Sequence, residues 1–273
     1  MSLFVTSLNS GSNGNCYYVG NDTEAILVDA GLSCRETEKR MDRLGLSMQI
    51  VKAVFISHEH NDHIYGLQAL AKRYQVPVYI TDKTRLNSSV KLDPRLVHTF
   101  YPFSPVQVGA LSVYAFPKCH DAADPHSFIV ASSSVKVGIF TDIGNPCNHV
   151  VDSFQKCNAV FLESNYDEKM LMNGRYPYHL KQRITGGKGH LSNSQALQLF
   201  LHHRPKFMSH LFLSHLSKEN NDPDIVRRLF APCTSSTSIV VTSRYNETPL
   251  YTISGANAIS FSTKPLQLQL SLF

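Results

Sequence analysis

The stretch His58-Glu59-His60-Asn61-Asp62-His63 carries three imidazoles and two carboxylates directly after the apolar run Ala53-Val54-Phe55-Ile56. Such a run is typical of a buried strand, and α/β folds place their chemistry where these strands end. Imidazole nitrogen and carboxylate oxygen are ligands that zinc, manganese or iron prefer in proteins. The stretch therefore predicts a metal site at a strand end rather than a solvated, histidine-rich loop.

One cation cannot use every group of this stretch, because several lie too close in the sequence to converge on a single tetrahedron. Two neighbouring cations can use them together. His58 and His60 should face the same way from an extended segment, whereas Asp62 and His63 should turn toward a second position. We therefore expect a centre with two divalent cations, zinc or manganese.

Further ligands should also follow strands, and His120, Asp142 and His215 each come just after an apolar run. A carboxylate such as Asp142 can bridge two cations with its two oxygens. Two cations lower the pKa of a bridging water enough to make it a nucleophile at neutral pH, and we place Asp62 in this catalytic machinery. The predicted ligands are His58, His60 and His120 for one cation, Asp62, His63 and His215 for the other, and Asp142 as the bridge.

Other histidines fit less well. His126 is an alternative to His120, although it should begin a buried strand, and His210 is an alternative to His215, although it lies inside an apolar run. Cys119 should face away from the metal, because neighbours on an extended segment point to opposite faces. The histidines that we interpret as surface or packing residues are His98, His149, His179, His202 and His203.

Short apolar strands alternate with helical patterns along the chain. Ser33 followed by Glu36 is typical of a helix start, and that helix should run to about Leu44. Hairpins of strands mixed with helices predict one domain with two sheets faced by helices. Further helices are predicted at about 63–74, 149–156 and 192–202, and strands at 3–8, 16–19, 25–29, 52–57, 78–81, 111–116, 127–131, 135–140, 159–162, 206–213, 238–242 and 250–253.

Composition sets wider limits on function. The 273 residues carry a formal net charge of +5, which mildly favours a polyanionic partner without specifying one. The start of the chain shows no signal peptide, and no apolar run approaches the length of a membrane span. The six cysteines are scattered without a paired spacing, so we expect a cytoplasmic protein with reduced thiols.

The metal-ligand pattern resembles that of the metallo-β-lactamase superfamily of dinuclear hydrolases. That resemblance implies a four-layer αββα sandwich. It extends over residues 4–253 and favours the WalJ/YycJ branch, whose members are regarded as metal-dependent DNA exonucleases that act 5′ to 3′ and are linked to mismatch repair. The segments similar to that branch are residues 10–15, 29–33, 176–177, 180–184, Gly189-His190-Leu191-Ser192-Asn193 and Ser214-His215-Leu216-Ser217, continued by Glu219-Asn220-Asn221.

Within this resemblance, His190 matches an extra histidine of the phosphodiesterases that process tRNA, where it contacts phosphate or protonates the leaving oxygen. Tyr166 stands where we expect many relatives to have histidine, which makes a catalytic role for this position doubtful. The nearby cations could contact backbone phosphates, or they could form a solvated face. The predicted substrate-binding residues are Lys181, Arg183, Lys188, His190 and Asn193.

The chain ends with a tail, residues 264–273, after a hydrolase domain that we place at 1–263. Its last five residues, Gln269-Leu270-Ser271-Leu272-Phe273, resemble the peptide with which bacterial repair proteins bind the DNA sliding clamp. We expect Gln269, Leu270, Leu272 and Phe273 to contact that partner. Leucine also alternates with polar residues from 266 to 272, so an edge strand remains the alternative.

The predicted metal centre and the resemblance together imply a dinuclear hydrolase of DNA phosphodiesters, a 5′-3′ exonuclease in DNA repair that uses in-line attack by a hydroxide between two cations. Two alternatives remain open. One is a small-molecule hydrolase of thioesters or lactones with the same fold. The other is a metal-binding regulatory protein without turnover.

Overall fold

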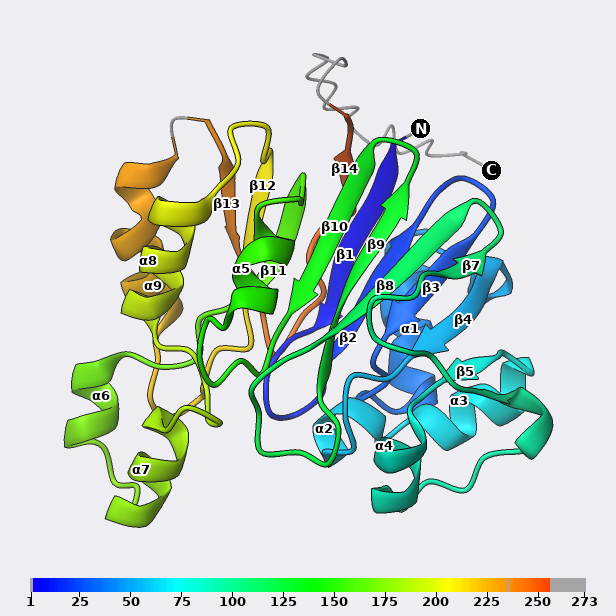
Figure 1. Ribbon diagram of the computed structural model, residues 1–273, viewed down its shortest axis with the longest axis horizontal. Coiled ribbons are helices and arrows are strands. Elements are labelled where there is room, and N and C mark those ends of the chain that lie inside the picture. Colours follow the sequence, from blue (N-terminus) through cyan, green and yellow to red (C-terminus); the bar gives the residue numbers. More distant parts are fainter. Residues whose placement is uncertain (1, 235, 256–273) are drawn as a thin grey trace, which may run out of the picture.

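A computed structural model describes residues 2–234 and 236–255 of the chain. Two seven-stranded sheets pack face to face, with helices on both outer sides (Figure 1). The predicted tail at 264–273, its four partner-binding residues and the domain boundary at 263 lie outside the described residues.

The first sheet has the strand order β14-β1-β2-β3-β4-β5-β6. Its strands β1 to β3 and β14 pair antiparallel, whereas β3 to β6 pair parallel. The strands are β1 (Leu3–Asn9), β2 (Cys16–Gly20), β3 (Ala25–Val28), β4 (Val51–Phe55), β5 (Val78–Tyr79), β6 (Val97–His98) and β14 (Tyr251–Ile253).

The second sheet has the order β13-β12-β11-β10-β9-β8-β7. Strands β7 to β10 form antiparallel pairs, and β10 to β13 run parallel. The strands are β7 (Val106–Val108), β8 (Leu111–Pro117), β9 (His126–Ser132), β10 (Val135–Phe140), β11 (Ala159–Glu163), β12 (His210–Ser214) and β13 (Ser238–Val241).

Helices α1 to α4 lie with the first sheet, and α5, α8 and α9 lie on the second (Figure 1). Within the described residues no helix is both long and apolar enough to cross a membrane. The helices are α1 (Cys34–Arg43), α2 (Asn61–Ile64), α3 (Leu67–Tyr74), α4 (Asp82–Asn87), α5 (Asn148–Phe154), α6 (Glu168–Asn173), α7 (Tyr178–Thr185), α8 (Asn193–His203) and α9 (Pro223–Phe230), with 3₁₀ turns at Met48–Ile50, Pro94–Leu96 and Ala231–Cys233.

Three apolar clusters make these layers. The central cluster joins the inner faces of the two sheets, where Phe55 meets Phe128 and Tyr17 meets Phe161 with ring centroids 5.7 and 5.1 Å apart. The other two clusters join each sheet to its own helices. Central strands such as β3 and β11 are therefore buried on both faces, which explains their continuous apolar sequence. The predicted αββα sandwich is confirmed.

One helix was predicted at 63–74, but the structure has two helices there, α2 and α3, separated at Gly66. A β-carbon at Gly66 would lie 1.8 Å from the Leu32 carbonyl oxygen, so the chain turns where only glycine fits. The strand predicted from residue 206 begins at His210, because Met208 N donates to Pro205 O and closes a turn there. Helix α7 escaped prediction because it buries no residue and has no core-facing stripe.

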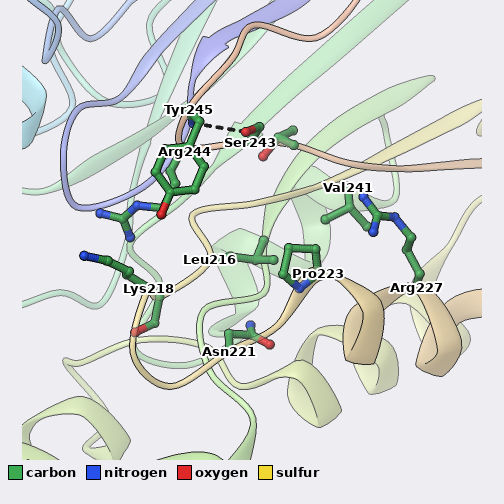
Figure 2. A pocket seen from close by; sticks show the side chains of 11 residues that line it. Leu216, Lys218, Asn221, Pro223, Arg227, Val241, Ser243, Arg244 and Tyr245 are labelled. Atoms are coloured by element: carbon green, nitrogen blue, oxygen red, sulfur yellow. Dashed lines mark hydrogen bonds between the residues drawn. The ribbon is translucent and has the colours of Figure 1, made fainter.

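A cavity of about 180 Å³ opens beside the end of β12 (Figure 2). It lies between the chain that follows this strand, at residues 216–223, and the chain that follows β13, at residues 241–245. Because β10, β11 and β12 run parallel to one another, the segments after them gather at one edge of their sheet, and the segment after β4 meets them there.

Candidate metal centre

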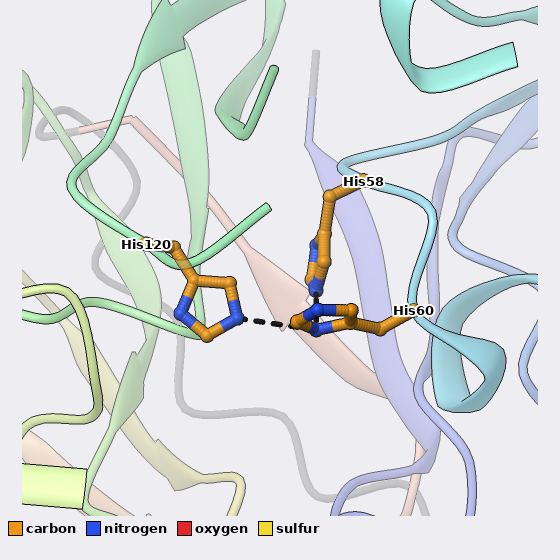
Figure 3. Close-up of side chains that lie close together, drawn as sticks. All are labelled: His58, His60 and His120. Atoms are coloured by element: carbon orange, nitrogen blue, oxygen red, sulfur yellow. Dashed lines mark hydrogen bonds between the residues drawn. The ribbon is translucent and has the colours of Figure 1, made fainter. Parts of the chain in front are cut away.

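Three imidazoles converge from two separate loops. His58 and His60 follow β4, and His120 follows β8 on the opposite sheet (Figure 3). His60 Nδ1 lies 3.0 Å from His58 Nε2 and 3.3 Å from His120 Nε2. We call this group, whose nitrogens all lie within 4.8 Å of one another, the three-histidine position.

A second group lies beside it. Asp62 Oδ2 is 3.5 Å from His63 Nε2 and 3.6 Å from His215 Nε2. His215 comes from the end of β12 in the second sheet, whereas the other two lie on α2. We call these three residues the carboxylate position.

Asp142 lies between the two positions. Its Oδ2 is 3.2 Å from His63 Nε2, and its Oδ1 is 3.4 Å from His215 Nδ1 and 3.9 Å from His120 Nε2. It also forms a potential metal-binding group with His58 and His63. The structure therefore brings together all seven residues predicted as ligands.

Four of the imidazoles are held through Nδ1, which directs their Nε2 atoms toward the centre. This is the arrangement that orients histidine in metal sites, where the second ring nitrogen bonds an oxygen. The contacts are His58 with Ser57 Oγ (2.9 Å), His63 with Asp29 Oδ2 (2.7 Å), His120 with Gly189 O (3.1 Å) and His215 with Glu163 Oε1 (2.9 Å).

Two buried atoms in the centre, Asp142 Oδ2 and His215 Nε2, have no hydrogen-bond partner among the residues that the structure describes. Leaving such atoms unpaired costs about 1–3 kcal/mol each, so they usually have a partner. Both atoms are lone-pair donors of the kind that bind divalent cations. The residues present thus fit a metal, and the clustered histidines and aspartates support divalent metal binding.

The two positions differ in charge. Burial lowers the pKa of His58 well below its ordinary value and that of His120 to about 4. Burial acts in the same direction on His63 and His215, but neighbouring carboxylates outweigh it. They raise the pKa of His63 well above its ordinary value and that of His215 to about 10. At neutral pH His58 and His120 are therefore uncharged, whereas His63 and His215 are surrounded by carboxylates.

Three residues around the centre adopt a left-handed backbone conformation. Asp29, Asp142 and His215 have φ angles of 63°, 55° and 57°. This conformation is uncommon outside glycine and costs about 1–3 kcal/mol where the surroundings impose it. Each residue directly follows or nearly follows a strand, so the turn directs its side chain into the centre.

Glycine allows the loops to meet. A β-carbon at Gly31 would lie 1.7 Å from the Asp62 carbonyl oxygen. That oxygen accepts a hydrogen bond from Asn15 N at 2.7 Å, and Asn15 Nδ2 donates to Asp62 Oδ2 at 3.1 Å. The loop at 10–15 therefore positions one of the proposed ligands.

Sequence reasoning missed two buried carboxylates, Asp29 and Glu163. Asp29 accepts from Ser57 N and Ser57 Oγ as well as from His63, and so connects β3 to the histidine loop. Glu163 is the last residue of β11, and Asp142 comes shortly after β10. A carboxylate at the end of an apolar run was therefore a sequence signal that could have identified Glu163 as a site residue.

Glu163 also holds His190. Its Oε1 lies 2.8 Å from His190 Nδ1, and its Oε2 accepts from Ile143 N and Leu191 N. Burial acts to raise the pKa of Glu163, but His190 and His215 outweigh it and lower that pKa to about 2. The His190 side chain is 24% exposed and lies 3.8 Å from Asp142 Oδ1. His190 is thus oriented at the open side of the centre.

The predicted substrate contacts divide into two kinds. Arg183 and Lys188 are exposed, with Arg183 bound to Asp121, and Lys181 Nζ donates to Met172 O. Asn193, in contrast, is buried. Its side chain bonds Ser164 Oγ and Asn221 Nδ2. The prediction that Asn193 contacts substrate is therefore wrong, because its amide is used to hold neighbouring loops.

The alternative histidines lie elsewhere. His126 begins β9 with Nδ1 bound to Asp124 O, and His210 stacks on Phe212; among the described residues neither belongs to a potential metal-binding group. Tyr166 is buried, and burial raises its pKa to about 12. It pairs with Ser192 in an isolated bridge, which is a structural role.

Comparison with known proteins identifies relatives. Residues 10–99 match the family model of the metallo-beta-lactamase superfamily. The chain is 35% identical over 232 residues to exodeoxyribonuclease YycJ of Bacillus anthracis, covering 83% of this chain and 87% of that protein. It is 31% identical over 219 residues to exodeoxyribonuclease WalJ of Streptococcus pneumoniae serotype 2 (strain D39 / NCTC 7466), covering 78% and 81%.

Among solved structures, the metallo-beta-lactamase fold protein YhfI of Bacillus subtilis superposes with a TM-score of 0.68 at 17% identity, covering 92% of this chain and 100% of that one. This likeness supports the fold. The sequence identity to the two exodeoxyribonucleases supports the branch. The chain is therefore an enzyme of the metallo-β-lactamase superfamily, in the branch that includes YycJ and WalJ.

Proposed function

We propose that this chain is a metal-dependent exodeoxyribonuclease that removes nucleotides from the 5′ end of DNA during repair. The names of the two relatives support DNA as the substrate. The main support for a dinuclear mechanism is the location of Asp142 between the two positions. Its Oδ2 faces His63 of the carboxylate position, and its Oδ1 faces His120 of the three-histidine position.

Two divalent cations, zinc or manganese, would supply an activated water and would neutralise charge on the phosphate that is attacked. The residues that would hold them are His58, His60 and His120 at one position, Asp62, His63 and His215 at the other, and Asp142 between them. Two cations held there would supply the charge stabilisation that in-line displacement at a phosphodiester requires.

The chain's own acid would be His190. Glu163 Oε1 holds its Nδ1 at 2.8 Å, which fixes the orientation of the ring. Nε2 is then the nitrogen that donates a proton to the leaving oxygen of the scissile nucleotide. Because Glu163 Oε1 also holds His215 Nδ1 at 2.9 Å, one carboxylate aligns the proposed acid with a proposed ligand.

Exposed cations would bind the rest of the strand. Arg183 and Lys188 lie near His190 along the chain, and their contacts with backbone phosphates would depend on charge. This surface would make binding sensitive to salt without specifying a base sequence.

The decisive experiment combines metal analysis with digestion of end-labelled DNA, single- and double-stranded, with and without a 5′ phosphate. Stepwise release of mononucleotides from the 5′ label, restored by zinc or manganese after chelation, is the expected result. A panel of thioesters and lactones provides the comparison. Rapid ester turnover by a protein that leaves DNA intact would contradict the proposal.

We place this activity in the cytoplasm and propose that residues 269–273 bind the DNA sliding clamp. Deleting these five residues should abolish clamp pull-down while metal content and basal nuclease rate stay unchanged. Loss of folding or of basal activity would instead support the edge strand.

A further inference from the structure

The cavity beside β12 is lined by three cationic residues, Lys218, Arg227 and Arg244 (Figure 2). Among the described residues that line it, none is aspartate or glutamate. Ser217 Oγ accepts from Asn220 N and keeps its own hydrogen for a ligand, whereas Asn221 Nδ2 is used within the protein, where it donates to Ser164 O and Asn165 O. A cavity with this lining favours an anion.

Arg244 is the least satisfied of the three cations. Within the described residues it forms no ion pair, and its buried Nη1 atom has no hydrogen-bond partner. Arg227, by comparison, pairs with Asp224 at 2.6 Å, and Lys218 lies 4.0 Å from Glu219. A guanidinium is a planar fork of N–H donors that can bind two oxygens of a phosphate, so a partly buried guanidinium with a free nitrogen among the described residues suits this anion.

This cavity adjoins the metal centre. Leu216, which lines it, directly follows the proposed ligand His215. The backbone N–H of His215 donates to Ser10 Oγ at 2.7 Å, and Ser10 N donates to Ser243 O at 3.1 Å. The same short loop therefore supports a proposed ligand on one side and the wall of the cavity on the other.

A neighbouring contact positions Arg244 itself. Asn13 Nδ2 donates to Arg244 O at 2.8 Å, and a β-carbon at Gly11 would lie 3.1 Å from Arg244 Cβ. The loop at 10–15 thus touches both the arginine and, through Asn15, the carboxylate position. One loop therefore separates the cavity from the carboxylate position.

We propose that the cavity is a phosphate subsite in which Arg244 and Lys218 bind a backbone phosphate of the DNA strand beyond the scissile one. This inference rests on the proposed function, since it assigns the cavity to the same substrate. It explains the unpaired guanidinium nitrogen and the absence of carboxylates from the described lining. Arg227, which already has a partner, would contribute less.

The test compares Arg244→Gln and Lys218→Gln with Arg228→Gln, each in the full metal-loaded chain. Arg228 is an exposed arginine on α9 next to Arg227, but it does not line the cavity. For single-stranded DNA, KM should rise about tenfold in Arg244→Gln, the loss expected for a charged hydrogen bond. The slope of log(kcat/KM) against log salt should fall by about 0.7, the value for one phosphate contact.

A small substrate separates the two sites. Bis(4-nitrophenyl) phosphate reaches the metals but cannot extend into the cavity, so Arg244→Gln should hydrolyse it at the wild-type rate. Arg244→Lys keeps the charge and should restore most of the affinity for DNA. Lys218 is exposed, so Lys218→Gln should keep the fold and give a smaller rise in KM.

Equilibrium binding of a labelled single strand, followed by anisotropy, keeps the two proposals distinct. If Arg244→Gln and Lys218→Gln bind DNA as Arg228→Gln does, the subsite is wrong even where the wild type degrades DNA. If the wild type binds DNA through Arg244 but never cleaves it, the proposed function fails and the subsite stands. Oligonucleotides with a 5′ phosphate or a 5′ hydroxyl show which phosphate is bound. If Arg244→Gln weakens the binding of both oligonucleotides equally, the bound phosphate is an internal one.

Discussion

The three-histidine position and the carboxylate position lie side by side, yet they are built differently. In the first, burial lowers the pKa of two imidazoles, those of His58 and His120, and that of His120 lies at about 4. The second combines Asp62 with two imidazoles whose pKa nearby carboxylates raise, as for His215 at about 10. The difference indicates that one position is ready for a cation at neutral pH, whereas the other must first release protons.

Their outer contacts differ in the same way. Ser57 Oγ and Gly189 O, both uncharged, hold His58 and His120. The buried carboxylates Asp29 and Glu163 hold His63 and His215. Charged outer contacts raise the basicity of an imidazole ligand, so the carboxylate position should bind a cation more tightly once its protons have left.

Asp142→Asn should have the largest effect, because Asp142 is the residue that both positions share. Asparagine keeps the size of the side chain and tolerates the φ of 55°. It loses the charge and one ligand oxygen. We expect turnover to fall about 10⁴- to 10⁶-fold, as for residues that act as a unit. Mass spectrometry of the metal content should show losses from both positions.

Asp62→Ala is the matched comparison, because it removes a residue of the carboxylate position alone. It should leave about one cation per chain, held by the three histidines. Two cations per chain in Asp62→Ala would contradict the division into two positions.

His190→Ala should separate proton transfer from metal binding. We expect kcat to fall about 10²- to 10⁴-fold, the usual contribution of a general acid, while both positions keep their cations. His179→Ala, at an exposed histidine of α7, is the control and should be indistinguishable from the wild type. An His190→Ala enzyme with full nuclease activity would remove this residue from the mechanism.

Asp29→Asn tests the outer contacts. Asparagine tolerates the φ of 63° at this residue, so the change mainly removes the charge beside His63. The affinity for a cation at the carboxylate position should fall about 10- to 100-fold, with the three-histidine position unaffected. Competition with a chelator measures this. Equal loss from both positions would mean that Asp29 supports the loop as a whole.

The smallest effect concerns pH. The pKa of His215 is raised to about 10, so below that pH a proton must leave before a cation binds. The pKa of His63 is also raised, so affinity at the carboxylate position should rise from pH 7 to 9 by about tenfold per pH unit for each of these two protons. Because the pKa of His120 is lowered to about 4, affinity at the three-histidine position should stay constant over that range.

Calorimetry in buffers of different ionisation enthalpy would count the protons released at each position. The same shift acts on the metal-free fold. A raised pKa at His215 stabilises that fold fully below pH 6.5, and the contribution is lost as pH rises through about 10.

The local sequence was sufficient for much of the fold. Apolar runs located the central strands, and Ser33 and Ser192 were sufficient to begin α1 and α8, where both hydroxyls accept a backbone hydrogen bond. Helices α4, α6, α7 and α9 were not predicted. The first three bury one residue or none, so they leave almost no periodic signal. Helix α9 buries Val226 and Phe230 and begins with Asp222 and Pro223, so a local signal for it was available in the sequence.

The sequence by itself determined which residues could bind a metal, because a dense histidine motif and single ligands after apolar runs are local features. The tertiary structure alone decided which groups orient them. Asp29 contacts His63, which is 34 residues away in the sequence, and Glu163 contacts His215, which is 52 residues away. No short-range sequence pattern predicts contacts over such separations. The same holds for the cavity at Arg244, since only packing of separate loops leaves a guanidinium nitrogen buried without a partner.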